Sequence, residues 1–303
     1  MSQNTRLPVQ KTYKLFIDGK FPRTESGRSW IVKSGEAIVA HACHASRKDL
    51  REAVEAARKA QVGWSNATAY NRGQVLYRIA EMMEGKRNEL IEALTAVEAK
   101  KSAKPAAKSK GAKPLSPEQE VNRAIDRVVY FAGWADKYAQ VLGCNNPVAG
   151  PYYNFTVPEA TGVVGVIAPD ESPLLGLVSL LIPVICSGNA AIAFASSTNP
   201  LPACVLAEVC ATSDVPGGVV NILTGSRSEL LAQYASHRDI DGIHAGGLTA
   251  EENAILRAGI AENIKRTDLH EKGVNWADDQ QCNSVYWIEP FVEMKTIWHP
   301  ASV

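Results

Sequence analysis

The chain has 303 residues, of which 46% are hydrophobic and 21% charged, a composition typical of a globular protein with one large domain or two smaller ones. Lysine plus arginine and aspartate plus glutamate both number 32, so no net charge draws the whole protein to nucleic acid or to an anionic membrane. The six cysteines form no Cys-x-x-Cys pair and several lie among apolar residues, which predicts a reduced, cytoplasmic protein.

The N-terminal half is predicted to contain short strands followed by helices. Residues 12–40 alternate strand-like segments with turns. Ser46 with Asp49 three residues later is a capping-box pattern, and the apolar residues from Leu50 to Trp64 then fall on one helical face. The same spacing predicts further helices over residues 75–83 and 90–97.

Residues 99–117 differ in character, because six lysines are set among alanine, serine, glycine and proline. Such a stretch has no apolar side chains to bury, so we expect a disordered, mobile insert. A basic nucleic-acid-binding tail is the alternative, but the segment lacks the interleaved aromatic residues that bind bases. Ser116-Pro117 then begins a helix that runs to a stop at Gly143.

From residue 162 onward, short apolar runs alternate with segments of helical length. This rhythm predicts successive βαβ units and a doubly wound parallel sheet, hence an α/β fold. Residues 172–207 contain no charged side chain, but Pro183 and Gly188 interrupt them, so we expect a buried helix and a buried strand rather than a membrane span. The predicted strands are Val163–Ala168, Ala190–Ala195, Val219–Leu223 and Ile240–Ala245.

The end of the chain breaks this rhythm. Residues 271–284 are polar, and Val285–Ile288 and Phe291–Trp298 are predicted to be extended segments divided by Glu289-Pro290. A final strand with charged residues among apolar ones suits the edge of a sheet or a contact between subunits. The alternative is that this strand folds back onto residues 152–157 of its own chain, which would give a stable monomer.

Four segments are distinctive in sequence: Leu-Phe-Ile-Asp-Gly (15–19), Phe-Ala-Gly-Trp-Ala (131–135), Gly-Val-Val-Gly-Val-Ile (162–167) and Pro-Gly-Gly-Val-Val-Asn-Ile-Leu-Thr-Gly (216–225). Together they resemble the NAD(P)-dependent aldehyde dehydrogenase superfamily. The resemblance runs from residue 12 to about 273 and resumes at residues 291–297, which look like the strand that ends the family's chains. The residues between Gly273 and Val285 therefore stand where the family has a whole catalytic domain.

The resemblance implies a division of the chain. Residues 12–143 and 159–273 resemble the NAD(P)-binding domain with its N-terminal helical layer, and residues 144–158 and 285–299 resemble a β oligomerisation element. With the catalytic domain missing, the layout is also similar to the degenerate second module of the aldehyde dehydrogenase 16 family.

The family's chemistry needs a cysteine nucleophile, an oxyanion site and a general base. No cysteine here has the family's Gly-Gln-x-Cys setting, and Cys282, the nearest to the junction, is expected to be a plain surface thiol. Glu171 stands where the family has an asparagine amide, and a carboxylate does not donate to an oxyanion. His270 stands at the position of the family's base and is expected to be structural or solvent-facing. We therefore expect no catalytic residue, with Glu171 and His270 as degenerate positions.

The positions that bind the dinucleotide in the family are altered in the same way. Phe194 and Ser197 replace the lysine and glutamate that bind the adenosine ribose, and Leu248 replaces the serine of the Phe-Thr-Gly-Ser turn at the pyrophosphate. Gly225 and Gly247 match family glycines, and tight strand-to-helix turns explain them better than dinucleotide binding. We expect no NAD(P) binding, or only weak binding. The His41-Ala42-Cys43-His44 cluster lacks a second ligand pair, so no metal site is expected.

These observations favour a catalytically silent aldehyde dehydrogenase homologue that acts as a scaffold or partner subunit, as a homo-oligomer or with a complete aldehyde dehydrogenase. One alternative is an NAD(P)-dependent oxidoreductase that borrows its nucleophile from another chain, and another is a soluble dinucleotide sensor. Retained ribose-binding residues would have favoured either alternative. No nucleic-acid or membrane partner is expected.

Overall fold

The computed structural model describes residues 9–97 and 115–301. The predicted disordered insert, 99–117, lies outside these residues except for its last three positions, 115–117. Of those, Ser116 caps a helix through its side chain and Pro117 begins it, as the sequence predicts.

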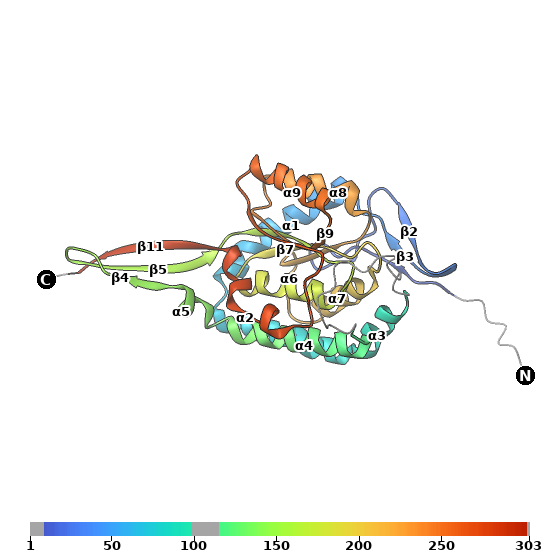
Figure 1. Ribbon diagram of the computed structural model, residues 1–303, viewed down its shortest axis with the longest axis horizontal. Helices are drawn as coiled ribbons and strands as arrows, with labels where there is room; N and C mark the ends of the chain where they lie inside the picture. The colour runs from blue at the N-terminus through green and yellow to red at the C-terminus, as the bar shows by residue number, and fades with distance from the viewer. Residues whose placement is uncertain (1–8, 98–114, 302–303) are drawn as a thin grey trace, which may run out of the picture.

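A five-stranded parallel sheet lies at the centre of the protein (Figure 1). The strand order is β10-β9-β6-β7-β8, so the chain runs outward from β6 in one direction and then returns to build β9 and β10 on the other side. This confirms the doubly wound α/β prediction. The strands are β6 (Val163–Ile167), β7 (Ala190–Phe194), β8 (Val220–Leu223), β9 (Gly242–Leu248) and β10 (Arg266–Glu271).

Helices cover both faces of this sheet and bury separate apolar clusters against it. One cluster joins the sheet to α2, α4, α6 and α7, and the other joins it to α1, α8 and α9. Their bounds are α1 (Arg47–Asn66), α2 (Ala69–Gly85), α4 (Pro117–Trp134), α6 (Leu175–Cys186), α7 (Leu201–Ala211), α8 (Arg227–Ser236) and α9 (Ala250–Ala261). Both faces of the central strands are therefore apolar, which is why β6 and β7 are buried at every residue.

The uncharged segment 172–207 forms α6, β7 and the first part of α7, as a buried helix followed by a buried strand. Among the described residues no helix combines the length and the apolar character that a membrane crossing requires. The helix predicted from residue 116 to Gly143 is interrupted after α4 and resumes as α5 (Tyr138–Leu142). The interruption leaves Tyr138 buried, with its hydroxyl 3.4 Å from the Ser187 carbonyl.

The smaller elements lie mainly at one end of the body. Strands β1 (Thr12–Tyr13), β2 (Ser29–Ser34) and β3 (Ala37–Cys43) form a three-stranded sheet in the order β1-β3-β2, and α3 (Arg87–Thr95) packs against α7 and α4.

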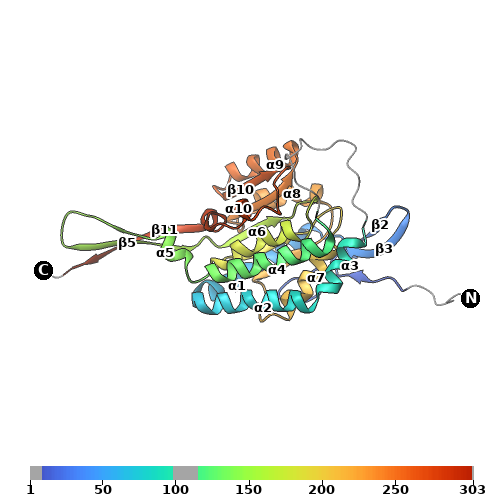
Figure 2. The same ribbon diagram turned by 60° about the horizontal axis from the view of Figure 1, so that its bottom comes forward.

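A three-stranded antiparallel arm projects from the opposite end of the molecule (Figures 1 and 2). It contains β4 (Cys144–Asn146), β5 (Tyr152–Ala160) and β11 (Val292–Pro300), in the order β11-β5-β4. The last strand thus folds back onto β5 of its own chain over its whole length, which is the alternative to pairing with a neighbouring subunit that the sequence left open.

One prediction for this region is wrong. Residues 285–288 are not extended, because Val285–Trp287 and Glu289–Phe291 form two 3₁₀ turns, η1 and η2. Val285, Trp287, Ile288 and Phe291 are all buried against the sheet body, and the helical turns bring these closely spaced apolar residues to one side.

Candidate site at the carboxyl edge of the parallel sheet

The chain reverses its direction of winding between β6 and β9, and ligands of doubly wound sheets bind outside the carboxyl ends of the strands at this switch point. The segments that follow the strands are Pro169–Glu171 after β6, 195–198 after β7, 224–226 after β8 and Thr249 after β9. Three candidate residues from the sequence, Glu171, Ser197 and Gly225, lie in these segments. Phe194, Gly247 and Leu248 lie at the carboxyl ends of the strands beside them.

A polar network joins two of these segments and the first residue of α8. Asp170 accepts hydrogen bonds from the Ser196 hydroxyl at 2.7 Å and from the Ser197 amide at 2.8 Å. The Arg227 guanidinium lies 3.6 Å from the same carboxylate oxygen and donates to the Ala168 carbonyl at 2.6 Å. Arg227 is only 7% exposed, and its two terminal nitrogens donate to Glu252 and to the Ala168 carbonyl, so these nitrogens already have partners within the protein.

The turn at Gly247 is covered by Glu171. Gly247 has φ +65°, a left-handed conformation that favours glycine, and a Cβ there would lie 2.6 Å from Glu171 Oε2. The space left by the missing side chain of Gly247 is therefore taken by the Glu171 carboxylate of the same chain. Asp170 and Glu171 point to different partners, as expected for adjacent residues of an extended loop.

The N-terminus of α9 is also occupied by the protein's own groups. Thr249 caps the helix and Glu252 accepts from the Thr249 amide at 2.9 Å, which completes a capping box. Glu251 and Glu252 both lie in the first turn, and backbone and Thr249 hydrogen bonds lower the pKa of Glu251. A pyrophosphate at this helix end would meet these carboxylates as well as Glu171, so like charges oppose the binding that a free helix N-terminus favours.

The other candidate positions face the protein interior. Phe194 is 2% exposed and its ring packs edge-on against Tyr234 at 6.1 Å, and Leu248 is 1% exposed. The Ser197 hydroxyl is buried and has no hydrogen-bond partner among the described residues. At Gly225, with φ +148°, a Cβ would lie 3.0 Å from the His44 ring. This glycine is needed so that the segment at His44 can pack against the turn.

These residues do not fit a bound dinucleotide. Gly247 and Gly225 pack against Glu171 and His44, and Thr249 and Glu252 form a capping box at the helix end. The apolar side chains of Phe194 and Leu248 stand at two positions where the family binds the cofactor through polar groups.

His270 lies on the neighbouring strand β10, apart from the edge just described. Its ring stacks on Trp287 with centroids 4.8 Å apart, and its Nε2 lies 3.2 Å from Asp268 Oδ1. The ring of His244, on β9, lies 5.8 Å away, and burial lowers the pKa of His244 to about 3. The sequence placed His270 at the position of the family's base, and the structure gives it a partly buried place beneath aromatic side chains.

The cysteines offer no activated nucleophile. All six are free, and burial raises the pKa of Cys186, Cys204 and Cys210 to about 12. The prediction that Cys282 is a surface thiol is wrong: it is 0% exposed and packs with the aromatic residues of the 272–291 segment, and burial raises its pKa as well. Its neighbours in the sequence are polar, so only the fold reveals that the short helix α10 (Asp279–Cys282) turns it inward.

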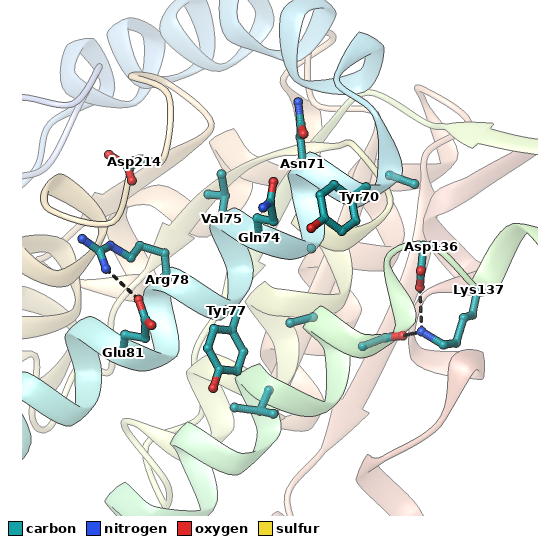
Figure 3. Close-up of a pocket in the computed structure, with 15 residues that line it drawn as sticks. Tyr70, Asn71, Gln74, Val75, Tyr77, Arg78, Glu81, Asp136, Lys137 and Asp214 are labelled. Atoms are coloured by element: carbon teal, nitrogen blue, oxygen red, sulfur yellow. Dashed lines mark hydrogen bonds and ion pairs between the residues drawn. The ribbon is translucent and has the colours of Figure 1, made fainter.

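A separate hollow of about 940 Å³ lies between α2 and α4 (Figure 3). Its main charged groups pair with one another, Arg78 with Glu81 at 2.7 Å and Lys137 with Asp136 at 2.7 Å. None of the residues that the sequence singled out for chemistry lines it. It is therefore a weaker candidate than the carboxyl edge of the sheet.

The sheet order and the covering helices define an α/β fold of the dinucleotide-binding type. The chain belongs to the aldehyde dehydrogenase family, whose model matches residues 25–277.

Among its relatives, cytosolic aldehyde dehydrogenase 1 of Elephantulus edwardii is 32% identical over 270 residues, which are 88% of this chain and 51% of that protein. Cytosolic 10-formyltetrahydrofolate dehydrogenase of Mus musculus is 31% identical over 279 residues, which are 88% of this chain and 29% of that protein. The NAD⁺ complex of aldehyde dehydrogenase from Bacillus cereus matches with a TM-score of 0.75 and 27% identity, over 85% of this chain and 50% of that one. The chain thus spans about half the length of the first of these relatives and of this solved structure.

Proposed function

We propose that this chain is a catalytically silent member of the aldehyde dehydrogenase family that acts as a scaffold or partner subunit of a complete aldehyde dehydrogenase. The observation that carries the proposal is the projecting arm, in which β11 has an edge that pairs with no other strand of the described residues. The filled carboxyl edge of the parallel sheet supports the proposed lack of catalytic activity.

Three features argue against turnover by the chain alone. No cysteine has the family's Gly-Gln-x-Cys setting, and the thiol nearest the junction, Cys282, is buried. The carboxylate of Glu171 stands where an oxyanion donor is needed. The switch point of the sheet is filled by the protein's own side chains, which leaves no suitable place for the hydride acceptor.

The arm has the features of a surface that pairs with another chain. Within the described residues, β11 is hydrogen-bonded to β5 alone, so one edge of this nine-residue strand is unpaired. Met294 and Trp298 on β11 are 43% and 58% exposed, and Tyr153 on β5 is 64% exposed. A long edge strand with exposed apolar side chains is prone to aggregate unless another strand or surface covers it.

The register identifies which backbone groups face the free edge. Just beyond the two ends of the ladder, the Thr161 amide donates to the Phe291 carbonyl and the Ala301 amide donates to the Pro151 carbonyl, so residues 291 and 301 lie at hydrogen-bonded positions. Hydrogen-bonded pairs alternate along an antiparallel ladder, so the odd-numbered residues of β11 bond to β5. The even-numbered residues, which include Met294 and Trp298, direct their N–H and C=O groups outward.

A proline at Met294 tests this edge without breaking the arm. It removes an outward N–H and leaves the bonds to β5 intact, and proline is tolerated at such edge positions. Met294→Ala is the matched control, because it shortens the same side chain but keeps the N–H. We would compare the intact chain with both variants by sedimentation velocity, each alone and mixed with a complete aldehyde dehydrogenase from the same cell.

We expect the intact chain and Met294→Ala to sediment as an assembly, with themselves or with the complete enzyme, and Met294→Pro to lose that assembly while keeping its fold. An interface of ordinary size buries about 1,200–2,000 Å² in total, so the complex should persist at micromolar concentrations. The proposal fails if the intact chain stays monomeric at tens of micromolar and never sediments with the complete enzyme.

A further inference from the structure

Three metal-ligating side chains meet on one face of the sheet where β9 and β10 pair. Asp268 is the register partner of His244, so both side chains leave the sheet on the same face. His270 follows Asp268 by two residues and returns to that face, and the register irregularity between Leu269 and Glu271 falls at this position. One ligand atom from each residue lies within 4.8 Å of the other two.

The orientation of the His244 ring is fixed by its Nδ1, which lies 2.8 Å from the Leu180 carbonyl. A carbonyl only accepts hydrogen bonds, so Nδ1 carries the proton. Because His244 is 0% exposed, its imidazole is held neutral, and Nε2 then carries a lone pair and no hydrogen.

This lone pair faces an anion. His244 Nε2 lies 3.6 Å from Asp268 Oδ2 and has no hydrogen-bond partner among the described residues. The Nε2 of His270, 3.2 Å from Asp268 Oδ1, is also buried and unpartnered. The buried Nε2 of His244 is thus an unpaired acceptor that faces a carboxylate, which is costly, and a cation between them would relieve that cost.

We propose that His244, Asp268 and His270 bind a divalent transition-metal ion, with zinc as the best match to two imidazoles and one carboxylate. The hydrogen bond from His244 to Leu180 is the outer contact that metal-binding histidines usually make to a backbone carbonyl. Three protein ligands leave the fourth position of a tetrahedral ion to water.

The spacing of the ligand atoms suits such an ion. Ligands on a tetrahedral zinc with bonds of about 2.0–2.2 Å lie roughly 3.3–3.6 Å apart. The carboxylate of Asp268 is already 3.2 Å and 3.6 Å from the two imidazole nitrogens. The ligand nitrogens of the two imidazoles lie within 4.8 Å of each other, so these atoms have to approach by no more than about 1.5 Å.

The surroundings would hold the ion and still admit it. Trp287 stacks on His270, and Phe291 lies 4.9 Å from His244, so apolar rings form one wall of the site. Asp268 and His270 are 27% and 23% exposed, which leaves a route from solvent. The ion would join the edge strand β10 to β9, independently of any assembly through the arm.

The test begins with the full chain, stripped of metal by a chelator and titrated with zinc against a competing dye. We expect one zinc ion per chain with submicromolar affinity, and visible absorption bands of tetrahedral geometry when Co²⁺ replaces zinc. Asp268→Asn and His270→Ala should each weaken binding at least about a hundredfold, because each removes a ligand. His299→Ala, on the exposed end of the arm, is the matched control and should bind as the intact chain does.

The proposal is overturned if the stripped chain binds no zinc in the micromolar range, or if Asp268→Asn and His270→Ala bind zinc as tightly as His299→Ala. Circular dichroism of each variant shows whether it is folded. If a variant unfolds, the stoichiometry and the Co²⁺ spectrum of the intact chain decide the question.

Discussion

Arg127 should hold the 272–291 segment onto the helices more strongly than any other charged residue in contact with that segment. Its side chain is 0% exposed and donates to the Ser179 hydroxyl at 2.6 Å, the Trp276 carbonyl at 3.2 Å and Asp279 at 3.0 Å. In Arg127→Met the buried Trp276 carbonyl loses this partner, which costs about 1–3 kcal/mol, and the charged hydrogen bond to Ser179 is also lost. Asp279 is 56% exposed and regains water, so its ion pair contributes little. We expect a loss of about 2–4 kcal/mol in the free energy of unfolding.

Arg123, one turn earlier on α4, provides a matched control. It binds the same segment through the Ala277 carbonyl and Asp279, but its side chain is 39% exposed. Arg123→Met should therefore cost less than about 1 kcal/mol. Urea unfolding measures both values, and hydrogen exchange at residues 276–282 should accelerate in Arg127→Met alone. Equal losses of unfolding free energy in the two variants would show that burial of the arginine does not determine how strongly it holds the 272–291 segment.

The remaining predictions concern the chemistry that the chain lacks. Incubation with NAD⁺ or NADP⁺ and a panel of short and aromatic aldehydes should form no NADH or NADPH, and turnover that Cys282→Ser abolishes would refute this. Calorimetry should find weak NAD binding, because three polar contacts of the family are lost and each contributes about 0.5–1.5 kcal/mol. The dissociation constant should therefore be one to three orders of magnitude higher than with those contacts present, and a low micromolar value would contradict the filled site. Iodoacetamide at neutral pH should label the exposed Cys144 and spare the buried Cys282, and equal labelling of both would mean that the 272–291 segment opens readily.

The parts of the fold that follow periodic rules could be predicted from the sequence. The apolar runs at 163–168 and 190–195 form central strands because both of their faces are covered, and such strands are continuous apolar segments. Ser46 and Ser116 form the capping boxes that their helix starts require, Ser46 with Asp49 as the sequence indicated.

The parts that depend on tertiary packing could not be predicted in the same way. β10 is an edge strand with a polar sequence, Arg-Thr-Asp-Leu-His-Glu, so it has no apolar alternation to reveal it. The His244 cluster could not be predicted because His244 is far in the sequence from Asp268 and His270 and meets them only through the register of β9 and β10. An Asp-x-His pattern on one strand, next to a strand with an inward-facing histidine, is the sequence pattern that would indicate such a cluster.

The central claim, that the outer edge of β11 pairs with another subunit, is tested most directly by residue-resolved hydrogen exchange along that strand. In the dilute chain alone, the amides of Lys295 and Ile297 should be protected by β5, and those of Met294, Thr296 and Trp298 should exchange rapidly. In the assembled state, with itself or with a complete aldehyde dehydrogenase, we predict that the even-numbered amides become protected to a similar degree. If an assembly forms while these amides still exchange as in the free chain, the strand edge is not the interface and the account is wrong.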